Sequence, residues 1–143
     1  MRHNVVIVSS VLILALGVLG LMGGGSIFRT TQEPIILQPS EAYQRWKKEG
    51  NRVAIVDVRT PEEYYESHVK GAKNIDFYSD FENKVNELPK EKIYFLYCAS
   101  GNRSKAAAQI MRERGLTAYS IGGLRSLAQV GFPIKKGYED HSE

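Results

Sequence analysis

One stretch of the sequence limits what this chain can fold into more than any other. Residues 93–97 are apolar and rich in aromatic side chains, which is typical of a buried strand. The chain's single cysteine, Cys98, follows at once, and a short polar loop containing Gly101 comes next. Residues 105–111 are mostly strong helix formers. The stretch therefore predicts a strand, a tight loop and a helix in direct succession, with the cysteine at the strand's end.

The loop after this strand has the chemistry of an anion-binding site. Consecutive backbone N–H groups can point inward as a nest, and the helix N-terminus adds partial positive charge. Both favour a thiolate at Cys98 over a thiol, and the thiolate is the nucleophilic form. A lone cysteine in a core strand is more often only a small buried side chain. Gly101, Arg103 and the onset of the helix make the reactive site the better prediction.

Strand-like and helix-like patterns alternate along most of the chain. Strands are predicted at residues 35–37, 53–56, close to 75, 93–97 and 117–121. Helices are predicted from Pro39 to Gly50 with Ser40 as N-cap and Gly50 as αL cap, from a Thr60–Glu63 capping box, and at 78–85, 103–114 and 124–130. Such alternation predicts an α/β fold with a parallel sheet covered by helices on both faces.

Three motifs, in the right order, resemble signatures of the rhodanese family of sulfurtransferases. Cys-Ala-Ser-Gly-Asn-Arg-Ser at 98–104 resembles the family's active-site loop. Residues 57–64 with 68–75 resemble its first signature, and Gly122-Gly123 with 131–134 its C-terminal one. The resemblance covers nearly all of residues 35–137 and implies a rhodanese-like three-layer α/β/α fold with a parallel central sheet. The family often has Trp where Leu127 stands, a position that looks like packing rather than chemistry.

The resemblance also implies a two-step chemistry. The Cys98 thiolate would take sulfane sulfur from a small donor such as thiosulfate or a persulfide, and a thiol or cyanide would then remove it. Arg103 would attract the anionic donor and help to lower the pKa of the cysteine. The loop would bind substrate and stabilise the persulfide through its N–H groups, with residues Ala99, Ser100, Gly101, Asn102, Arg103 and Ser104. No metal or organic cofactor is needed.

Asp57, Arg59 and His68 are predicted to support the site. Asp57 and Arg59 follow the strand 53–56, at the carboxyl end where α/β sheets place ligands. They could contact substrate, but the resemblance assigns them mainly to the wall beside the catalytic loop, through ion pairing. It makes His68 a residue that organises the loop, since a thiolate formed by a nest needs no general base.

Two other classes of function remain open. A phosphatase or arsenate reductase on the same fold is disfavoured, because cysteine phosphatases have five residues between Cys and Arg, whereas the four residues 99–102 separate Cys98 from Arg103. The other class is a non-catalytic module that carries or senses sulfur, or only binds a partner. Whether the chain is a sulfurtransferase or a non-catalytic module, a second protein could serve as its sulfur donor or acceptor. The intact Cys98 and Arg103 argue against an inactive domain.

The first 28 residues differ from the rest. Residues 4–28 carry no charge, and residues 5–22 are apolar apart from Ser9 and Ser10. The length of this run approaches the length of a membrane-spanning helix, about 20 residues. It also exceeds the usual length of the apolar core of a signal peptide. The prediction is a transmembrane or signal helix at 1–28, with membrane contact through 5–28, a linker at 29–34, the rhodanese-like domain at 35–137 and a polar tail at 138–143. A cleaved signal, with cleavage near residues 23–26, is the alternative.

Charges suggest which side of the membrane the domain occupies. Arg2 precedes the apolar run and favours the cytoplasm for that end, so the domain would be extracytoplasmic on a single-pass anchor, or exported if a signal is cleaved. Arg29 just beyond the run weakens this bias.

Composition excludes several other functions. All 16 acidic residues follow residue 32, so the net charge of +3 leaves the rest of the chain almost neutral. No basic stripe indicates nucleic-acid binding. A single cysteine excludes an internal disulfide and a cysteine-cluster metal site, and the three histidines lack the spacing of metal ligands.

Overall fold

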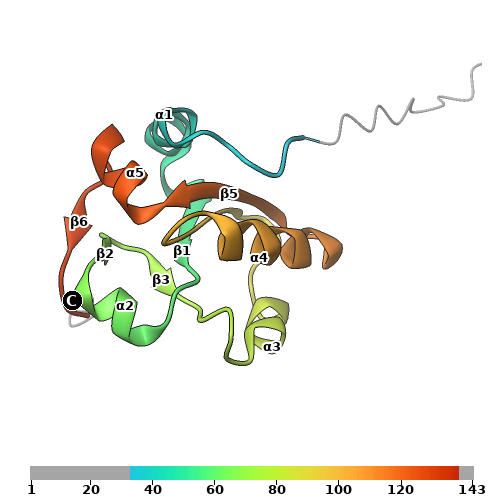
Figure 1. The fold of residues 1–143 in the computed structure, drawn as a ribbon. Coiled ribbons are helices and arrows are strands. Elements are labelled where there is room, and N and C mark those ends of the chain that lie inside the picture. Colours follow the sequence, from blue (N-terminus) through green and yellow to red (C-terminus); the bar gives the residue numbers. More distant parts are fainter. Residues whose placement is uncertain (1–32, 139–143) are drawn as a thin grey trace, which may run out of the picture. The chain divides into compact units, whose positions relative to one another are not determined.

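The centre of the fold is a four-stranded parallel sheet. The computed structural model describes residues 33–138. Its strands are β1 (Val53–Asp57), β3 (Lys73–Asn74), β4 (Ile93–Cys98) and β5 (Thr117–Gly123). They lie in the order β3-β1-β4-β5 with every pairing parallel. Figure 1 shows the sheet with the helices around it. The parallel central sheet predicted from the sequence is confirmed, although the strand predicted at 35–37 is reduced to one bridge between Ile36 and Ser120.

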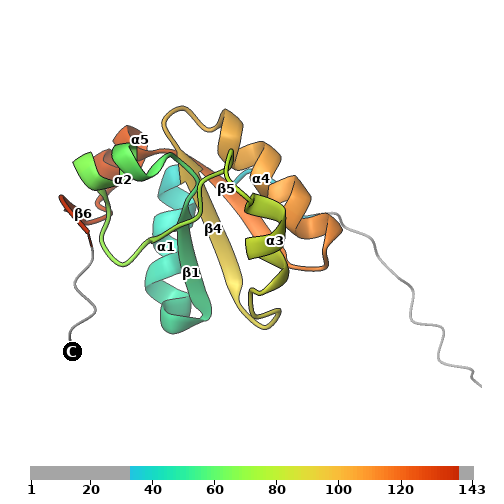
Figure 2. The ribbon, with the colours of Figure 1, turned by 90° about the horizontal axis from the view of Figure 1, so that it is seen from below.

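Helices cover both faces of this sheet. They are α1 (Pro39–Glu49), the 3₁₀ turn η1 (Gly50–Arg52), α2 (Pro61–Glu66), α3 (Phe81–Asn86), α4 (Asn102–Glu113) and α5 (Leu124–Val130). Figure 2 shows α3 and α4 on one side of the strands and α1 and α5 on the other. The result is three layers, α/β/α.

The side chains of β4 divide the core in two. All six residues of β4 are buried, and successive side chains point to opposite faces of the sheet. Ile93, Phe95 and Tyr97 pack in one cluster with residues of α1 and α5, among them the fully buried Leu127. Tyr94, Leu96 and Cys98 pack in a second cluster with α3 and α4. A strand buried on both faces reads as a continuous apolar run, which is why the sequence identified it.

Three helix ends differ from the prediction. The N-cap of α1 is Gln38 rather than Ser40, and Pro39 takes the first helical position, where its missing N–H costs nothing. Gly50 has φ 56° and ψ −125°, which is not the αL conformation. The helix predicted from residue 78 begins at Phe81, because Asp80 has φ 54° and interrupts helical geometry. The capping box of Thr60 and Glu63 is present.

A second, two-stranded sheet was not predicted. β2 (His68–Val69) and β6 (Ile134–Lys135) pair antiparallel, and the Lys70 N–H donates to the Pro133 carbonyl at 2.8 Å. Strands of two residues are too short to show a period in a sequence. This small sheet fastens the C-terminal part of the domain beside α2.

The predicted membrane segment lies outside this description. The anchor or signal segment at 1–28, most of the linker at 29–34 and the tail beyond Tyr138 are not among the described residues. Between residues 33 and 138, none of the helices has both the length and the apolar character needed to cross a bilayer.

Candidate active site

The loop between β4 and α4 wraps around the sulfur of Cys98. Cys98 ends β4 and is fully buried, and α4 begins four residues later at Asn102. Gly101 is the N-cap of α4 with φ 102°, a left-handed conformation that side chains other than glycine rarely adopt. This turn directs the Gly101 N–H back to the Cys98 Sγ at 3.0 Å. Ala99, Ser100 and Asn102 have exposed side chains, so the loop offers its backbone inward.

The surroundings of the sulfur favour the thiolate. Burial raises the pKa of Cys98, but the backbone N–H and hydroxyl of Ser104, with the N–H groups of Gly101 and Ser100, outweigh it and leave the pKa below its ordinary value. Ser104 is itself buried, and its hydroxyl contacts the Gly101 carbonyl at 3.1 Å and the Ser120 hydroxyl at 2.7 Å. The lowered pKa therefore has local causes, as the sequence predicts for a nest at a helix start.

Arg103 is paired with a carboxylate. Its two terminal nitrogens donate to the two oxygens of Glu63 at 2.8 and 2.9 Å, a bidentate ion pair. The hydrogen bond from Arg103 is the largest cause that lowers the pKa of Glu63 to about 2. The Arg103 guanidinium also lies 5.9 Å from the ring centroid of Tyr78, whose side chain is exposed. Glu63 therefore offsets part of the Arg103 charge, and the role of Arg103 in attracting an anionic donor stays a prediction.

Gly123 of β5 packs closely against the loop that follows Cys98. It ends β5 and pairs in register with Cys98. A Cβ atom at Gly123 would lie 2.2 Å from the Ala99 carbonyl oxygen, a distance that would force the loop to move. The second glycine of the Gly122-Gly123 motif therefore allows β5 and the Cys98 loop to touch.

Asp57 and Arg59 form a buried ion pair beneath the same edge of the sheet. Arg59 donates to both oxygens of Asp57, with Nη2 to Oδ2 at 2.6 Å, and also to the Ser67 carbonyl at 2.6 Å. The Tyr97 hydroxyl donates to Asp57 Oδ2 at 2.7 Å and accepts the Val69 N–H at 2.9 Å. Burial and the charge of Asp57 raise the pKa of Tyr97, so this hydroxyl keeps its proton. The network anchors the residue before Cys98, which fits the supporting role predicted for the pair.

His68 lies in β2 and is fully buried. Its Nδ1 is 2.9 Å from the Tyr64 carbonyl, and its ring stacks on the Tyr64 ring with centroids 3.8 Å apart. The Tyr64 hydroxyl in turn donates to the Ala72 carbonyl at 2.8 Å. These contacts join α2 to the segment that follows it, and the role of His68 in organising the Cys98 loop stays a prediction.

Three residues near the loop were not predicted to act there: Glu63, Ser120 and Gly123. Glu63 was identified only as part of a capping box, and its partner Arg103 lies 40 residues away. Ser120 contacts Ser104 across 16 residues. Contacts between distant segments leave no periodic signal in one sequence. Among residues 33–138, no group of three His, Cys, Asp or Glu side chains is placed to hold a metal ion.

Comparisons with known proteins agree with this geometry. A family model described as Rhodanese-like domain matches residues 38–129. "Thiosulfate sulfurtransferase PspE" of Escherichia coli is 37% identical over 75 residues, which are 51% of this chain and 72% of that protein. "Uncharacterized protein YqhL" of Bacillus subtilis is 37% identical over 73 residues, 50% of this chain and 57% of that protein. "Putative sulfur carrier protein YrkF" of B. subtilis is 33% identical over 75 residues, 52% of this chain and 40% of that protein.

Solved structures show the same fold. A rhodanese-related protein from Thermoplasma volcanium superposes with a TM-score of 0.62 at 28% identity, covering 71% of this chain and 98% of that one. A Rhodanese-like Domain Protein from Staphylococcus aureus gives a TM-score of 0.58 at 28% identity, covering 66% and 91%. The fold, the three motifs and the match over residues 38–129 lead to one conclusion: the chain belongs to the rhodanese-like domain family.

Proposed function

We propose that this protein is a sulfurtransferase that moves sulfane sulfur from a donor to an acceptor through a persulfide on Cys98. The observation that carries the proposal is the Cys98 Sγ, which receives the Gly101 N–H at 3.0 Å inside a loop whose groups lower the pKa of its thiol. A sulfur atom held this way ionises at a lower pH than an ordinary cysteine thiol. Its buried surroundings strengthen the hydrogen bonds that stabilise its charge.

The first step is a nucleophilic displacement at sulfur. With thiosulfate as donor, the Cys98 thiolate attacks the sulfane sulfur, and a new S–S bond forms to Cys98 Sγ. The S–S bond of thiosulfate breaks, and its electron pair leaves with sulfite. The negative charge of the resulting persulfide moves to the outer sulfur, which N–H groups of the loop can stabilise. No external oxidant or reductant is needed.

The second step returns the enzyme to its starting state. Cyanide or a thiolate attacks the outer sulfur, the persulfide S–S bond breaks, and its electron pair returns to Cys98 as thiolate. The products are thiocyanate or a new persulfide. The names of two relatives support this range of partners, since PspE is named a thiosulfate sulfurtransferase and YrkF a putative sulfur carrier protein.

Intact-mass spectrometry tests the proposal directly. The full chain, purified in a non-ionic detergent, is incubated with thiosulfate and then with cyanide. The expected result is a gain of one sulfur, about 32 Da, that cyanide removes as thiocyanate and that Cys98→Ala abolishes. Because Cys98 is the only cysteine, an adduct reports on this position alone.

The alternatives make different predictions in the same assay. Failure to load sulfur from thiosulfate, polysulfide or a low-molecular-weight persulfide would support the partner-binding module instead. Hydrolysis of para-nitrophenyl phosphate that depends on Cys98 would support a phosphatase. Only the four residues 99–102 separate Cys98 from Arg103, so we expect no such hydrolysis.

The proposal extends to a membrane location. The apolar run at residues 5–22, outside the described residues, supports a single-pass anchor that tethers an extracytoplasmic sulfurtransferase domain. Arg2 before this run supports that orientation. If the segment is instead a signal that is cleaved, the same domain is exported.

A further inference from the structure

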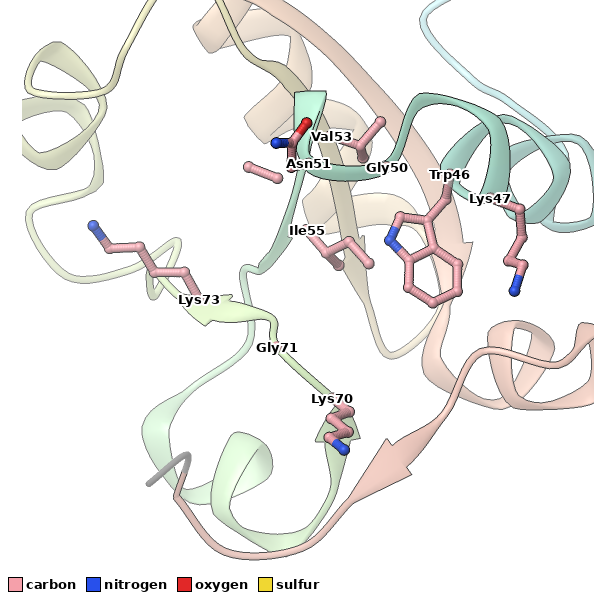
Figure 3. Close-up of a pocket in the computed structure, with 10 residues that line it drawn as sticks. Trp46, Lys47, Gly50, Asn51, Val53, Ile55, Lys70, Gly71 and Lys73 are labelled. Atoms are coloured by element: carbon pink, nitrogen blue, oxygen red, sulfur yellow. The ribbon is translucent and has the colours of Figure 1, made fainter. Parts of the chain in front are cut away.

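A groove of about 530 Å³ lies at the amino end of β1. The candidate active site follows the carboxyl end of β4, and β1 and β4 are parallel neighbours, so the groove lies at the opposite end of the sheet. Figure 3 shows Trp46 and Lys47 of α1 on one side of it and Lys70 and Lys73 on the other, with Ile55 between them. Two stretches of the chain, residues 46–55 and 70–73, therefore build this surface.

The edge of the sheet is open in this groove. On this side β1 pairs only with β3, and β3 begins at Lys73, which lies opposite Val56. The other side of β1 pairs with β4 along its whole length, but on the side of β3 no strand of residues 33–138 pairs with Val53 to Ile55. An unpaired strand edge presents N–H and C=O groups that another extended chain can bind.

Alternation along β1 shows which backbone groups face the groove. The Val58 N–H donates to the Tyr97 carbonyl on β4, whereas the Asp57 carbonyl accepts the Ile75 N–H on the opposite side. Alternate residues of a parallel strand point their backbone groups to alternate neighbours. The Ile55 N–H and the Val53 C=O therefore face the groove, while the Val53 N–H already donates to the Gly50 carbonyl. A parallel strand matches this pair, because one of its residues can donate to Val53 and accept from Ile55.

The charged side chains that line the groove are all positive. Lys47, Lys70 and Lys73 line it, and no Asp or Glu is among its lining residues. All three lysines are exposed, and none of them belongs to an ion pair of the described residues. An occupant with carboxylate side chains would be electrostatically complementary.

The floor of the groove is apolar and held in place. Trp46 stacks on the buried Phe132 with ring centroids 5.1 Å apart, and Val53 and Ile55 are only 8% and 6% exposed. Such a floor can accept an apolar side chain without rearrangement, which lowers the entropic cost of binding.

We propose that this groove binds an extended, acidic segment of a partner protein, which adds to the edge of β1 as a short parallel strand in line with β3. Main-chain hydrogen bonds to Val53 and Ile55 would fix the segment, and the lysines would select acidic sequences. The opposite end of the sheet stays uncovered, so a bound partner leaves the Cys98 loop accessible. This docking site is independent of the chemistry proposed for Cys98.

Fluorescence of Trp46 provides a local assay, because Trp46 is the only tryptophan of the chain. The full chain in non-ionic detergent is titrated with a synthetic peptide of alternating glutamate and valine. We expect a saturable change in Trp46 emission. The same peptide with a proline or an N-methylated residue at its centre should bind several-fold more weakly, because the N–H that would donate to Val53 is missing. Equal binding of these peptides would mean a general anion site and would reject strand addition.

Charge reversal tests the lysines with a matched control. The double substitution Lys70→Glu/Lys73→Glu should weaken binding of the glutamate–valine peptide about tenfold or more, since two ion pairs become repulsions. Lys48→Glu/Lys90→Glu makes the same change of net charge at exposed lysines outside the groove and should have little effect. Equal losses in both variants, or equal binding of a lysine–valine peptide, would overturn the proposal. Thermal unfolding of both variants shows that each is folded.

Discussion

Ser104 favours the thiolate of Cys98 through two of its groups. After burial, which opposes ionisation, its backbone N–H and its hydroxyl are the largest influences on the pKa of Cys98. Ser100 contributes through its backbone N–H, and its side chain is exposed. Both serines therefore act through a backbone N–H, and only Ser104 also acts through its hydroxyl.

This difference can be measured as a pH profile. Ser104→Ala should raise the pKa of Cys98, so the rate of alkylation by iodoacetamide should reach half its maximum at a higher pH than in the unmodified chain. Ser100→Ala keeps its N–H and should leave the profile where it was. Identical profiles for all three proteins would mean that the backbone alone sets the pKa of Cys98. Thermal unfolding serves as the control, because Ser104→Ala leaves the buried Ser120 hydroxyl without this partner, at a cost of about 1–3 kcal/mol.

Glu63 should control which donors the site accepts. Its bidentate pair with Arg103 offsets the positive charge near the loop. Glu63→Gln keeps a hydrogen-bond acceptor but removes the negative charge, so we expect sulfur loading from dianionic thiosulfate to rise relative to loading from an uncharged organic polysulfide. Glu66→Gln, an exposed residue of the same helix, makes the same change of charge and should not alter this ratio. Loading measured by intact mass decides the prediction, and an unchanged ratio in Glu63→Gln would contradict it.

At the scale of helices and strands, the sequence indicated the elements better than the contacts between them. β4 and α4 were predicted within a residue or two, because a doubly buried strand and a run of helix formers each leave a clear pattern. The position of Cys98 at the end of β4 followed from those two elements. The pairing of Glu63 with Arg103 and the contact of Gly123 with Ala99 each join segments that are distant in the sequence. The pairing of β2 with β6 rests on two residues in each strand.

The contact between β5 and the catalytic loop predicts a specific loss of function. Gly123→Ala would place a methyl group 2.2 Å from the Ala99 carbonyl oxygen, so the loop must shift and its N–H groups must leave the sulfur. We expect persulfide loading at Cys98 to fall by at least about tenfold. The measurement is the rate of sulfur addition from thiosulfate, followed by intact mass.

Gly115→Ala is the matched control for this substitution. Gly115 follows α4 with φ 79°, and no heavy atom lies within 4 Å of the position that its Cβ would occupy. Alanine there should lower stability by about 1–2 kcal/mol through backbone strain alone and leave loading intact. If the two variants lost loading in parallel with stability, the close approach of Gly123 would have no special role.

For the molecule as a whole, the proposed tether predicts where the domain is found in a cell. Protease added to intact spheroplasts that express the full chain should degrade the domain while a cytoplasmic marker survives, as expected for an extracytoplasmic domain on an anchor at residues 5–28. Survival of the domain until the membrane is lysed would reverse the orientation. Release into the soluble fraction without the first ~25 residues would indicate a cleaved signal.

The all-parallel sheet has a consequence for how the protein is made. Parallel neighbours need long crossovers, so the partners of β4 come from both earlier and later in the chain, as in the pairs of Ile93 with Val53 and with Thr117. The loop around Cys98 is complete only once β5 has docked and Gly123 lies behind Ala99. An unfolded or half-folded chain therefore carries Cys98 without the surrounding groups that lower its pKa. We therefore expect the pH midpoint for alkylation of this single cysteine to fall only when folding ends, so that the midpoint reports maturation of the domain.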